Sequence, residues 1–303
     1  MDLATALEEA PPSLAAGRAV YLKREDVHAL GAFKWRGALP VVEAYRARGA
    51  RGVVTASTGN HGAATAWAAA RVGIGAAVFV PEGASRAKVA LIAAQGASIH
   101  ETGADFDRAK DAARDFAAGR SLPFFEDGDE PIQWGGYGAI AREILDQCPE
   151  PPAAVIVPVG NGALIGGIGG VLRELAPGTL VVGAAAREAP VMAMSWRAGG
   201  AVACDRVATF ADGLAVRVAI PRAVERLRRV VDRMELVSER AIARAVGRFA
   251  AAGIRVEGGA AASLAALPGA DGAAGPVVLV VTGRNIDDDL HRRACERPES
   301  FPE

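Results

Sequence analysis

Lysine is scarce in this chain, and one lysine stands in a setting suited to chemistry. Of the 34 basic residues, only four are lysines: Lys23, Lys34, Lys88 and Lys110. Arginine keeps its proton near neutral pH, whereas a desolvated lysine can lose it and act as a Schiff-base nucleophile. Lys34 follows Phe33 in the segment GAFKWRGA, and apolar neighbours favour the neutral amine. Lys34 is therefore a candidate nucleophile, although taken alone it is more simply explained as an ordinary lysine at the start of a helix.

A glycine-rich turn between an apolar run and a helical segment is a second candidate site: Gly160-Asn161-Gly162-Ala163-Leu164. Backbone N–H groups can converge in such a turn, and the dipole of the following helix favours an anion such as phosphate. A plain strand–helix turn is the alternative. The glycines also loosely match a dinucleotide fingerprint, with Arg187 after the next strand as a reader of a 2′-phosphate. The imperfect spacing and mid-chain position argue against that dehydrogenase interpretation.

The elements that must position these residues follow from the apolar pattern. Five continuous apolar runs predict strands: Arg51–Ser57, Gly75–Pro81, Ala153–Val159, Thr179–Ala185 and Gly275–Gly283. Runs without alternation are typical of parallel strands buried on both faces. Alanine-rich segments between them predict helices, and Ser238 is the expected N-cap of one. This alternation predicts an open α/β architecture with mostly parallel sheets.

Three of the predicted strand ends carry unusual loops. They are Ser57–Gly62, Gly160–Leu164 and Thr282–Asn285. In open α/β folds, ligands bind beyond the carboxyl ends of the strands, where loops lead into helices. We therefore expect the ligand site at these three loops.

Composition excludes several classes of protein. The 34 basic residues balance 35 acidic ones, whereas a nucleic-acid binder should be visibly basic. The acidic N-terminal segment is unlike an export signal, and three scattered cysteines fit a reducing compartment, so we expect a cytoplasmic protein. The uncharged stretch Pro151–Leu172 contains Pro158 and many glycines, which would leave backbone groups unsatisfied in lipid. We expect this stretch to be a buried strand, a turn and a helix start rather than a membrane span.

Five segments in fixed order carry a family resemblance: LKREDVHALGAFKWRGA, ASTGNHGAATAWAA, PEGASRAKV, PVGNGALIGGIGG and VTGRN. From about Tyr21 to Asn285 the chain resembles the fold-type II pyridoxal-phosphate enzymes, most closely the threonine/serine dehydratase and serine racemase branch. The resemblance implies two open, mostly parallel sheet domains of the tryptophan synthase β-like type. Residues 1–49 with 133–303 would form a large cofactor-binding domain, and residues 50–132 a small mobile domain. It also implies a homodimer.

The resemblance assigns cofactor contacts residue by residue. Lys34, next to Phe33, would form the Schiff base with pyridoxal 5′-phosphate, and Asn60 would hydrogen-bond its phenolic oxygen. The Gly160–Leu164 turn would hold the phosphate. Thr282 would face the pyridine nitrogen, where a hydroxyl leaves the ring largely unprotonated and suits β-elimination.

Substrate contacts follow in the same way. Ser57, Thr58 and the backbone from Gly59 to His61, including Asn60, would hold the substrate carboxylate at a helix N-terminus. In the racemase branch a serine hydroxyl at the position of Thr58 protonates the face opposite the lysine, whereas dehydratases can have alanine there.

Four departures from the family pattern bear on specificity and metal binding. Asn161 and Ala163 stand where glycine is usual, and Arg284 replaces a glycine and brings a bulky cation. Glu257, by contrast, agrees with the family pattern and matches a glutamate near the cofactor. The alternative is that Glu257 is a buried carboxylate whose oxygens accept hydrogen bonds from backbone donors. Ala208 replaces the glutamate of a segment where members often bind a divalent cation, so no metal is expected near Asp212.

The resemblance implies a pyridoxal-phosphate lyase that removes water and ammonia from a small β-hydroxy amino acid such as L-threonine or L-serine. Two alternatives remain open. One is an amino-acid racemase with eliminase side activity, in which Thr58 would be the second proton carrier. The other is a non-catalytic protein that binds the cofactor or an amino acid.

Overall fold

The computed structural model describes residues 4–15 and 17–303. The chain divides into two compact units. The first unit comprises the described residues up to Phe33 together with Tyr137–Glu303, and the second unit comprises Lys34–Gly136. The division expected from the sequence placed residues 34–49 and 133–136 with the larger part, whereas here they group with the smaller one. The assignment of a cofactor-binding and a mobile domain stays a prediction.

The first unit is built on a six-stranded sheet. Its strands are β1 (Leu7–Glu9), β2 (Val20–Arg24), β6 (Ala154–Pro158), β7 (Leu180–Ala186), β8 (Arg233–Val237) and β9 (Val277–Val281). The order across the sheet is β1-β2-β9-β6-β7-β8. The β1 strand pairs antiparallel with β2, and the other four pairings are parallel. The predicted mostly parallel sheet is confirmed.

Helices of the first unit connect and cover this sheet. They are α1 (Pro12–Ala15), α6 (Pro131–Gln147, which begins in the second unit), α7 (Ala163–Leu175), α8 (Val191–Ala198), α9 (Pro221–Val230), α10 (Glu239–Ala251), α11 (Gly258–Ala265) and α12 (Asp288–Glu296). Every residue of β6 and β9 is buried, as continuous apolar runs predict. The expected N-cap of α10 is confirmed, since the Ser238 Oγ accepts from the Ala241 N–H at 3.2 Å.

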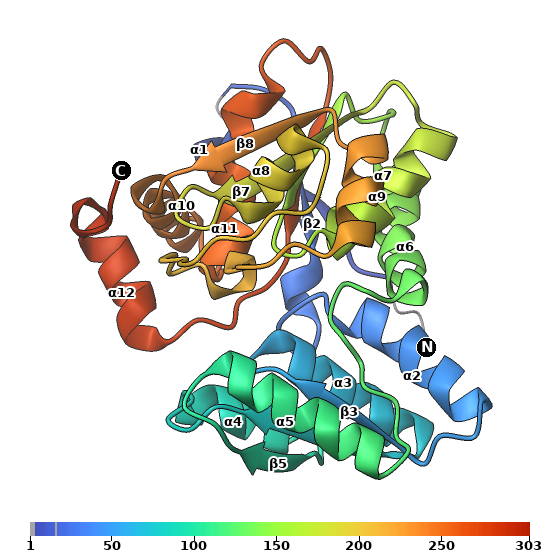
Figure 1. The fold of residues 1–303 in the computed structure, drawn as a ribbon. Coiled ribbons are helices and arrows are strands. Elements are labelled where there is room, and N and C mark those ends of the chain that lie inside the picture. The colour runs from blue at the N-terminus through green and yellow to red at the C-terminus, as the bar shows by residue number, and fades with distance from the viewer. Residues whose placement is uncertain (1–3, 16) are drawn as a thin grey trace. The chain divides into compact units, whose positions relative to one another are not determined.

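The helices α7 and α9 pack tightly against each other (Figure 1). A Cβ on Gly169 of α7 would lie 2.8 Å from the Val230 Cγ2 of α9. The Arg226 Nε donates to the Gly166 carbonyl at 3.0 Å. The glycines of α7 therefore let a neighbouring helix approach its backbone closely.

The second unit is a three-layer α/β body. Its elements are α2 (Trp35–Ala47), β3 (Gly52–Ala56), α3 (Asn60–Val72), β4 (Gly75–Val80), α4 (Arg86–Ala93), β5 (Ser98–Glu101) and α5 (Phe106–Gly119). The sheet has the order β3-β4-β5, and both pairings are parallel. Residues of α5 pack on one face with Val54 and Phe79, while α3 and α4 pack on the other with Val78 and Val80.

The uncharged stretch Pro151–Leu172 contains the buried strand β6, a turn and the first part of α7. Among the helices formed by the described residues, none is both long and apolar enough to cross a membrane. The expected strand, turn and helix start are confirmed.

Candidate active site

Two of the predicted ligand loops leave the same edge of the six-stranded sheet. The adjacent strands β6 and β9 are parallel, with Ala154 paired to Val277 and Ile156 to Leu279. In a parallel pair the carboxyl ends lie together. The turn after β6 and the turn after β9 therefore emerge side by side.

The turn from β6 into α7 has the geometry of an anion site. Gly162 adopts the left-handed conformation, with φ of +90°, and a Cβ there would lie 2.7 Å from the Leu227 Cδ1. A Cβ on Gly160 would overlap the carbonyl oxygen of Gly213. The Asn161 Oδ1 accepts from the Ala163 N–H at 3.1 Å. Because the first turn of a helix directs further N–H groups outward along its axis, this turn suits a phosphate.

The end of β9 is joined to the segment before the candidate lysine. Thr282 is buried, and its carbonyl accepts from the Phe33 N–H at 3.0 Å. The Arg284 N–H in turn donates to the Gly31 carbonyl at 2.9 Å. The Phe33 ring packs on Tyr137, with ring centroids 5.0 Å apart. These contacts fix Phe33, the residue that precedes Lys34 in the chain, at the carboxyl edge of the first unit's sheet.

Glu257 lies against the turn after β9. Its backbone N–H donates to the Gly283 carbonyl at 3.0 Å. A Cβ on Gly283 would lie 2.8 Å from the Glu257 carboxylate, which is almost fully buried. The Glu257 carboxylate therefore lies next to Gly283, the residue that follows Thr282. Its role toward a cofactor stays a prediction.

In the second unit, the turn from β3 into α3 carries the predicted substrate residues. Ser57 is buried, and its Oγ accepts from the N–H of Gly59, the N-cap of α3, at 3.2 Å. Thr58 and Asn60 are half-buried. The start of this 13-residue helix can bind an anion such as a carboxylate.

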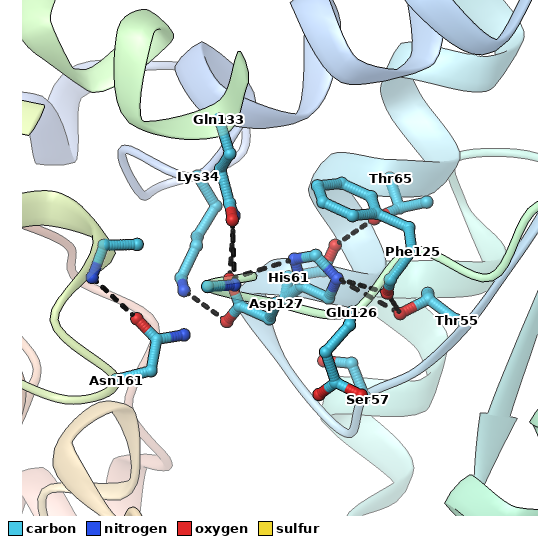
Figure 2. A network of polar contacts seen from close by, with 12 residues as sticks. Lys34, Thr55, Ser57, His61, Thr65, Phe125, Glu126, Asp127, Gln133 and Asn161 are labelled. Carbon is cyan, nitrogen blue, oxygen red and sulfur yellow. Dashed lines mark hydrogen bonds and ion pairs between the residues drawn. The ribbon is translucent and has the colours of Figure 1, made fainter. Parts of the chain in front are cut away.

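Lys34 is paired with a carboxylate that no motif contains. Its Nζ lies 2.5 Å from the Asp127 Oδ2, and the Gln133 Nε2 donates to the other carboxylate oxygen at 2.8 Å. Figure 2 shows both side chains directed at Asp127. The apolar surroundings expected for Lys34 are therefore interrupted by a charge. Asp127 has no local signal in the sequence, because it is one of several acids in the loop EDGDE.

His61 is buried and lies beside Asp127, on the side away from Lys34 (Figure 2). Its Nδ1 is 3.5 Å from the Asp127 Oδ1, and its Nε2 is 3.1 Å from the Thr55 Oγ1. Burial, aided by the Lys34 charge, lowers the pKa of His61, although Asp127 opposes this. Burial works to raise the pKa of Asp127, but Lys34 and His61 outweigh it and hold that pKa well below its usual range. Near neutral pH, Asp127 is therefore ionised beside a neutral His61.

The segment near Asp212 offers no carboxylate cluster. Ala208 donates its N–H to the Glu188 carbonyl, and the Asp212 Oδ1 accepts from the Gly213 N–H at 2.9 Å. Across residues 4–15 and 17–303, no group of three His, Cys, Asp or Glu side chains could hold a metal ion.

Known proteins similar in sequence include threonine lyases. The chain is 36% identical over 275 residues to an L-threonine ammonia-lyase of Geobacter sulfurreducens. The matched region covers 89% of this chain and 68% of that protein. It spans only 39% and 40% of the length of two L-threonine dehydratases, from Pasteurella multocida and Burkholderia multivorans.

Solved structures include both lyases and racemases. The processed form of threonine deaminase isoform 2 from Solanum lycopersicum has a TM-score of 0.90 and 29% identity, over 96% of this chain and 87% of that one. Maize serine racemase has a TM-score of 0.89 and 26% identity, over 98% and 92% of the two chains. The fold is thus shared by enzymes of two reaction types.

Each unit carries groups that suit a phosphorylated pyridine aldehyde. Lys34 supplies a primary amine, Thr282 a buried hydroxyl, and the turn into α7 the start of a 13-residue helix for a phosphate. Residues 3–283 match the family described as pyridoxal-phosphate dependent enzyme. The chain therefore belongs to the pyridoxal-phosphate dependent enzymes, of the fold-type II class, and its cofactor is pyridoxal phosphate.

Proposed function

We propose that this protein is a dehydratase, or ammonia-lyase, for a small β-hydroxy amino acid such as L-threonine or L-serine. The observation that carries the proposal is the buried Thr282 at the end of β9. A hydroxyl there, in place of a carboxylate, weakens the cofactor as an electron sink and so suits β-elimination. The threonine ammonia-lyase of Geobacter sulfurreducens supports the same assignment.

The chain's own groups account for the proton transfers. Bound pyridoxal phosphate supplies the sink for the electron pair that the α-proton leaves behind. The Lys34 amine takes the α-proton and becomes an ammonium. The β-carbon–oxygen bond then breaks, and the departing hydroxide takes the proton from the Lys34 ammonium and leaves as water. The resulting enamine hydrolyses to a 2-oxo acid and ammonia.

The turn into α3 would bind the substrate carboxylate. The Ser57 hydroxyl and the backbone N–H groups from Gly59 to His61 lie at the helix start, where the dipole favours negative charge. In this proposal Asn60 hydrogen-bonds the cofactor, and Thr58 faces the substrate α-carbon. These residues position the α-proton for Lys34.

The first test is the fate of Lys34. Borohydride should fix the cofactor onto Lys34, as peptide mass spectrometry would show, and Lys34→Ala should lower 2-oxo acid formation by about 10³-fold or more, because no other amine replaces it. Lys88→Ala is the matched control and should retain activity. Trapping on Lys23, Lys88 or Lys110 instead would contradict the assignment. Assays with L-threonine, L-serine and bulkier β-hydroxy amino acids would identify the substrate.

A racemase is the second candidate function. Thr58 offers a hydroxyl at the start of α3, and maize serine racemase has the same fold. Rapid release of deuterium-exchanged D-amino acid with little 2-oxo acid would favour it. A protein that binds cofactor and amino acid without releasing either product would be a non-catalytic binder.

We further propose that the protein is cytoplasmic and works as a homodimer. The three cysteines support a cytoplasmic location, because they are scattered along the chain and all are free thiols, as is usual in a reducing compartment. Sedimentation of the loaded protein would test the second, and a monomer at micromolar concentration would refute it.

A further inference from the structure

The carboxylate of Asp127 is built into the second unit to face Lys34. Its two oxygens are taken by different partners, Oδ2 by the Lys34 Nζ at 2.5 Å and Oδ1 by the Gln133 Nε2 at 2.8 Å. Gln133 is fully buried, and its Oε1 accepts from the Gly128 N–H at 2.8 Å. The loop that carries Asp127 is therefore clamped to the first turn of α6.

A second clamp holds the chain just before Asp127. The Thr55 Oγ1 of β3 donates to the Phe125 carbonyl at 2.8 Å, and the Phe125 N–H donates to the Val54 carbonyl at 2.7 Å. The Phe125 ring packs edge-on against His61, with ring centroids 4.6 Å apart. Because the chain is fixed on both sides of Asp127, its carboxylate is held in one position.

We propose that Asp127 is a positioning residue that receives the Lys34 amine whenever Lys34 is not joined to the cofactor, and that stabilises the ammonium formed once this amine has taken the α-proton. This inference rests on the proposed role of Lys34. Lys34 alternates between a state bonded to the cofactor and a state with a free amine. In the second state the carboxylate holds the neutral amine in one place while it takes the α-proton. It then holds the ammonium until the proton passes to the departing hydroxide and the amine can return to the cofactor.

The charges make Asp127 a counter-ion and not a base. When the substrate Cα–H bond breaks, the proton moves to the Lys34 nitrogen and the electron pair passes to the cofactor. Because the pKa of Asp127 lies well below its usual range, the carboxylate stays ionised and leaves the proton on Lys34. His61 is neutral, so Lys34 and not His61 is the cation that pairs with Asp127. The proton is then available for the departing hydroxide.

A neighbouring ion pair provides a matched control. Glu126 precedes Asp127 in the chain, and its Oε1 lies 2.5 Å from the Lys110 Nζ. Both lysines are mostly buried, with side chains 16% and 25% exposed for Lys34 and Lys110. Asp127→Asn and Glu126→Gln each neutralise one carboxylate beside one lysine. The two variants can therefore be compared lysine by lysine.

The test is a brief reductive methylation of the full-length protein freed of cofactor, read by peptide mass spectrometry. Asp127→Asn should raise the rate of labelling at Lys34 about fivefold, because a partly buried ion pair no longer holds the amine, and should leave Lys110 unchanged. Glu126→Gln should do the reverse. Unchanged Lys34 labelling in Asp127→Asn, or equal rises at both lysines, would overturn the proposal. Matching thermal midpoints would show that the fold is kept.

Steady-state kinetics of the loaded enzyme give the second readout. Asp127→Asn should lower kcat about tenfold or more with KM nearly unchanged, and Asp127→Glu should restore part of kcat. An equal fall for Asp127→Asn and Glu126→Gln would overturn a positioning role. If the wild type forms no 2-oxo acid, the proposed function fails, and the labelling experiment still decides the role of Asp127.

Discussion

Thr58 is the side chain on which the choice between elimination and racemisation depends. It is half-buried and lies between the buried Ser57 and Gly59, the N-cap of α3. Its hydroxyl could carry a proton, but its extra methyl group restricts the rotamers through β-branching. We therefore expect the Thr58 hydroxyl to deliver a proton to the substrate α-carbon only slowly, so that elimination dominates over racemisation.

Two substitutions test this reasoning. Thr58→Ala should keep most of the dehydratase rate, losing about tenfold, or about 1.4 kcal/mol, if the hydroxyl also helps to bind the carboxylate. Thr58→Ser should increase D-amino acid formation, since it removes only the methyl. Deuterium incorporation at the α-carbon of recovered substrate, with its chirality, is the measurement. Fast racemisation by the wild type with little 2-oxo acid would reverse the assignment.

Of the two partners in the ion pair between Lys34 and Asp127, only Lys34 is distinctive in the sequence. Lys34 stood out because lysine is rare and its neighbours are apolar. Asp127 lies 93 residues away from it in the chain and is surrounded by other acids. Nothing local distinguishes it, because its role depends on which cation the fold brings beside it.

Among the elements, the turn from β6 into α7 leaves little space beside its backbone. A Cβ on Gly160 would overlap the backbone oxygen of Gly213, which cannot rotate away as a side chain can. Gly160→Ala should therefore shift the turn and weaken cofactor binding about tenfold, a loss of about 1.4 kcal/mol. Gly178→Ala is the control, since nothing lies within 4 Å of a Cβ there. Absorbance titration with pyridoxal phosphate measures both, and equal affinities would refute the prediction.

Four of the five strands that the sequence predicted, β3, β6, β7 and β9, are buried along all or nearly all of their length. The β1, β2, β5 and β8 strands were not predicted, because each carries at least one charged residue. Lys23 of β2 is nonetheless fully buried, and its Nζ lies 2.6 Å from the Glu143 Oε2 and 2.5 Å from the Thr5 carbonyl. A buried charge is tolerated only with such partners. Hydropathy alone cannot reveal them, since they come from distant parts of the chain.

For the molecule as a whole, buried His61 makes stability depend on pH. Burial lowers its native pKa below the ordinary value of 6.5. As pH falls, the unfolded chain therefore binds a proton at His61 before the native chain does. The free energy of unfolding should therefore be fully maintained above about pH 6.5 and fall as pH decreases, by at most about 1.4 kcal/mol per pH unit. Urea unfolding between pH 8 and 5.5 measures this slope.

Tryptophan fluorescence is a suitable signal, because three of the four tryptophans lie in the second unit with His61: Trp35, Trp67 and Trp134. His61→Gln should flatten the pH dependence. His291→Gln is the control, since burial also lowers the pKa of His291 but it lies in the first unit. A slope that survives His61→Gln would show that other groups cause it.

The family, the cofactor and the α/β class could be inferred from the amino-acid sequence, because they depend on local features. Apolar runs mark buried strands, and motifs in fixed order mark the loops that follow them. Three contacts became visible only in the folded chain: Asp127 faces Lys34, Glu257 lies against Gly283, and the Phe33 N–H donates to the Thr282 carbonyl. These contacts join residues far apart in the chain. They form only when packing brings distant segments together, so no local pattern encodes them.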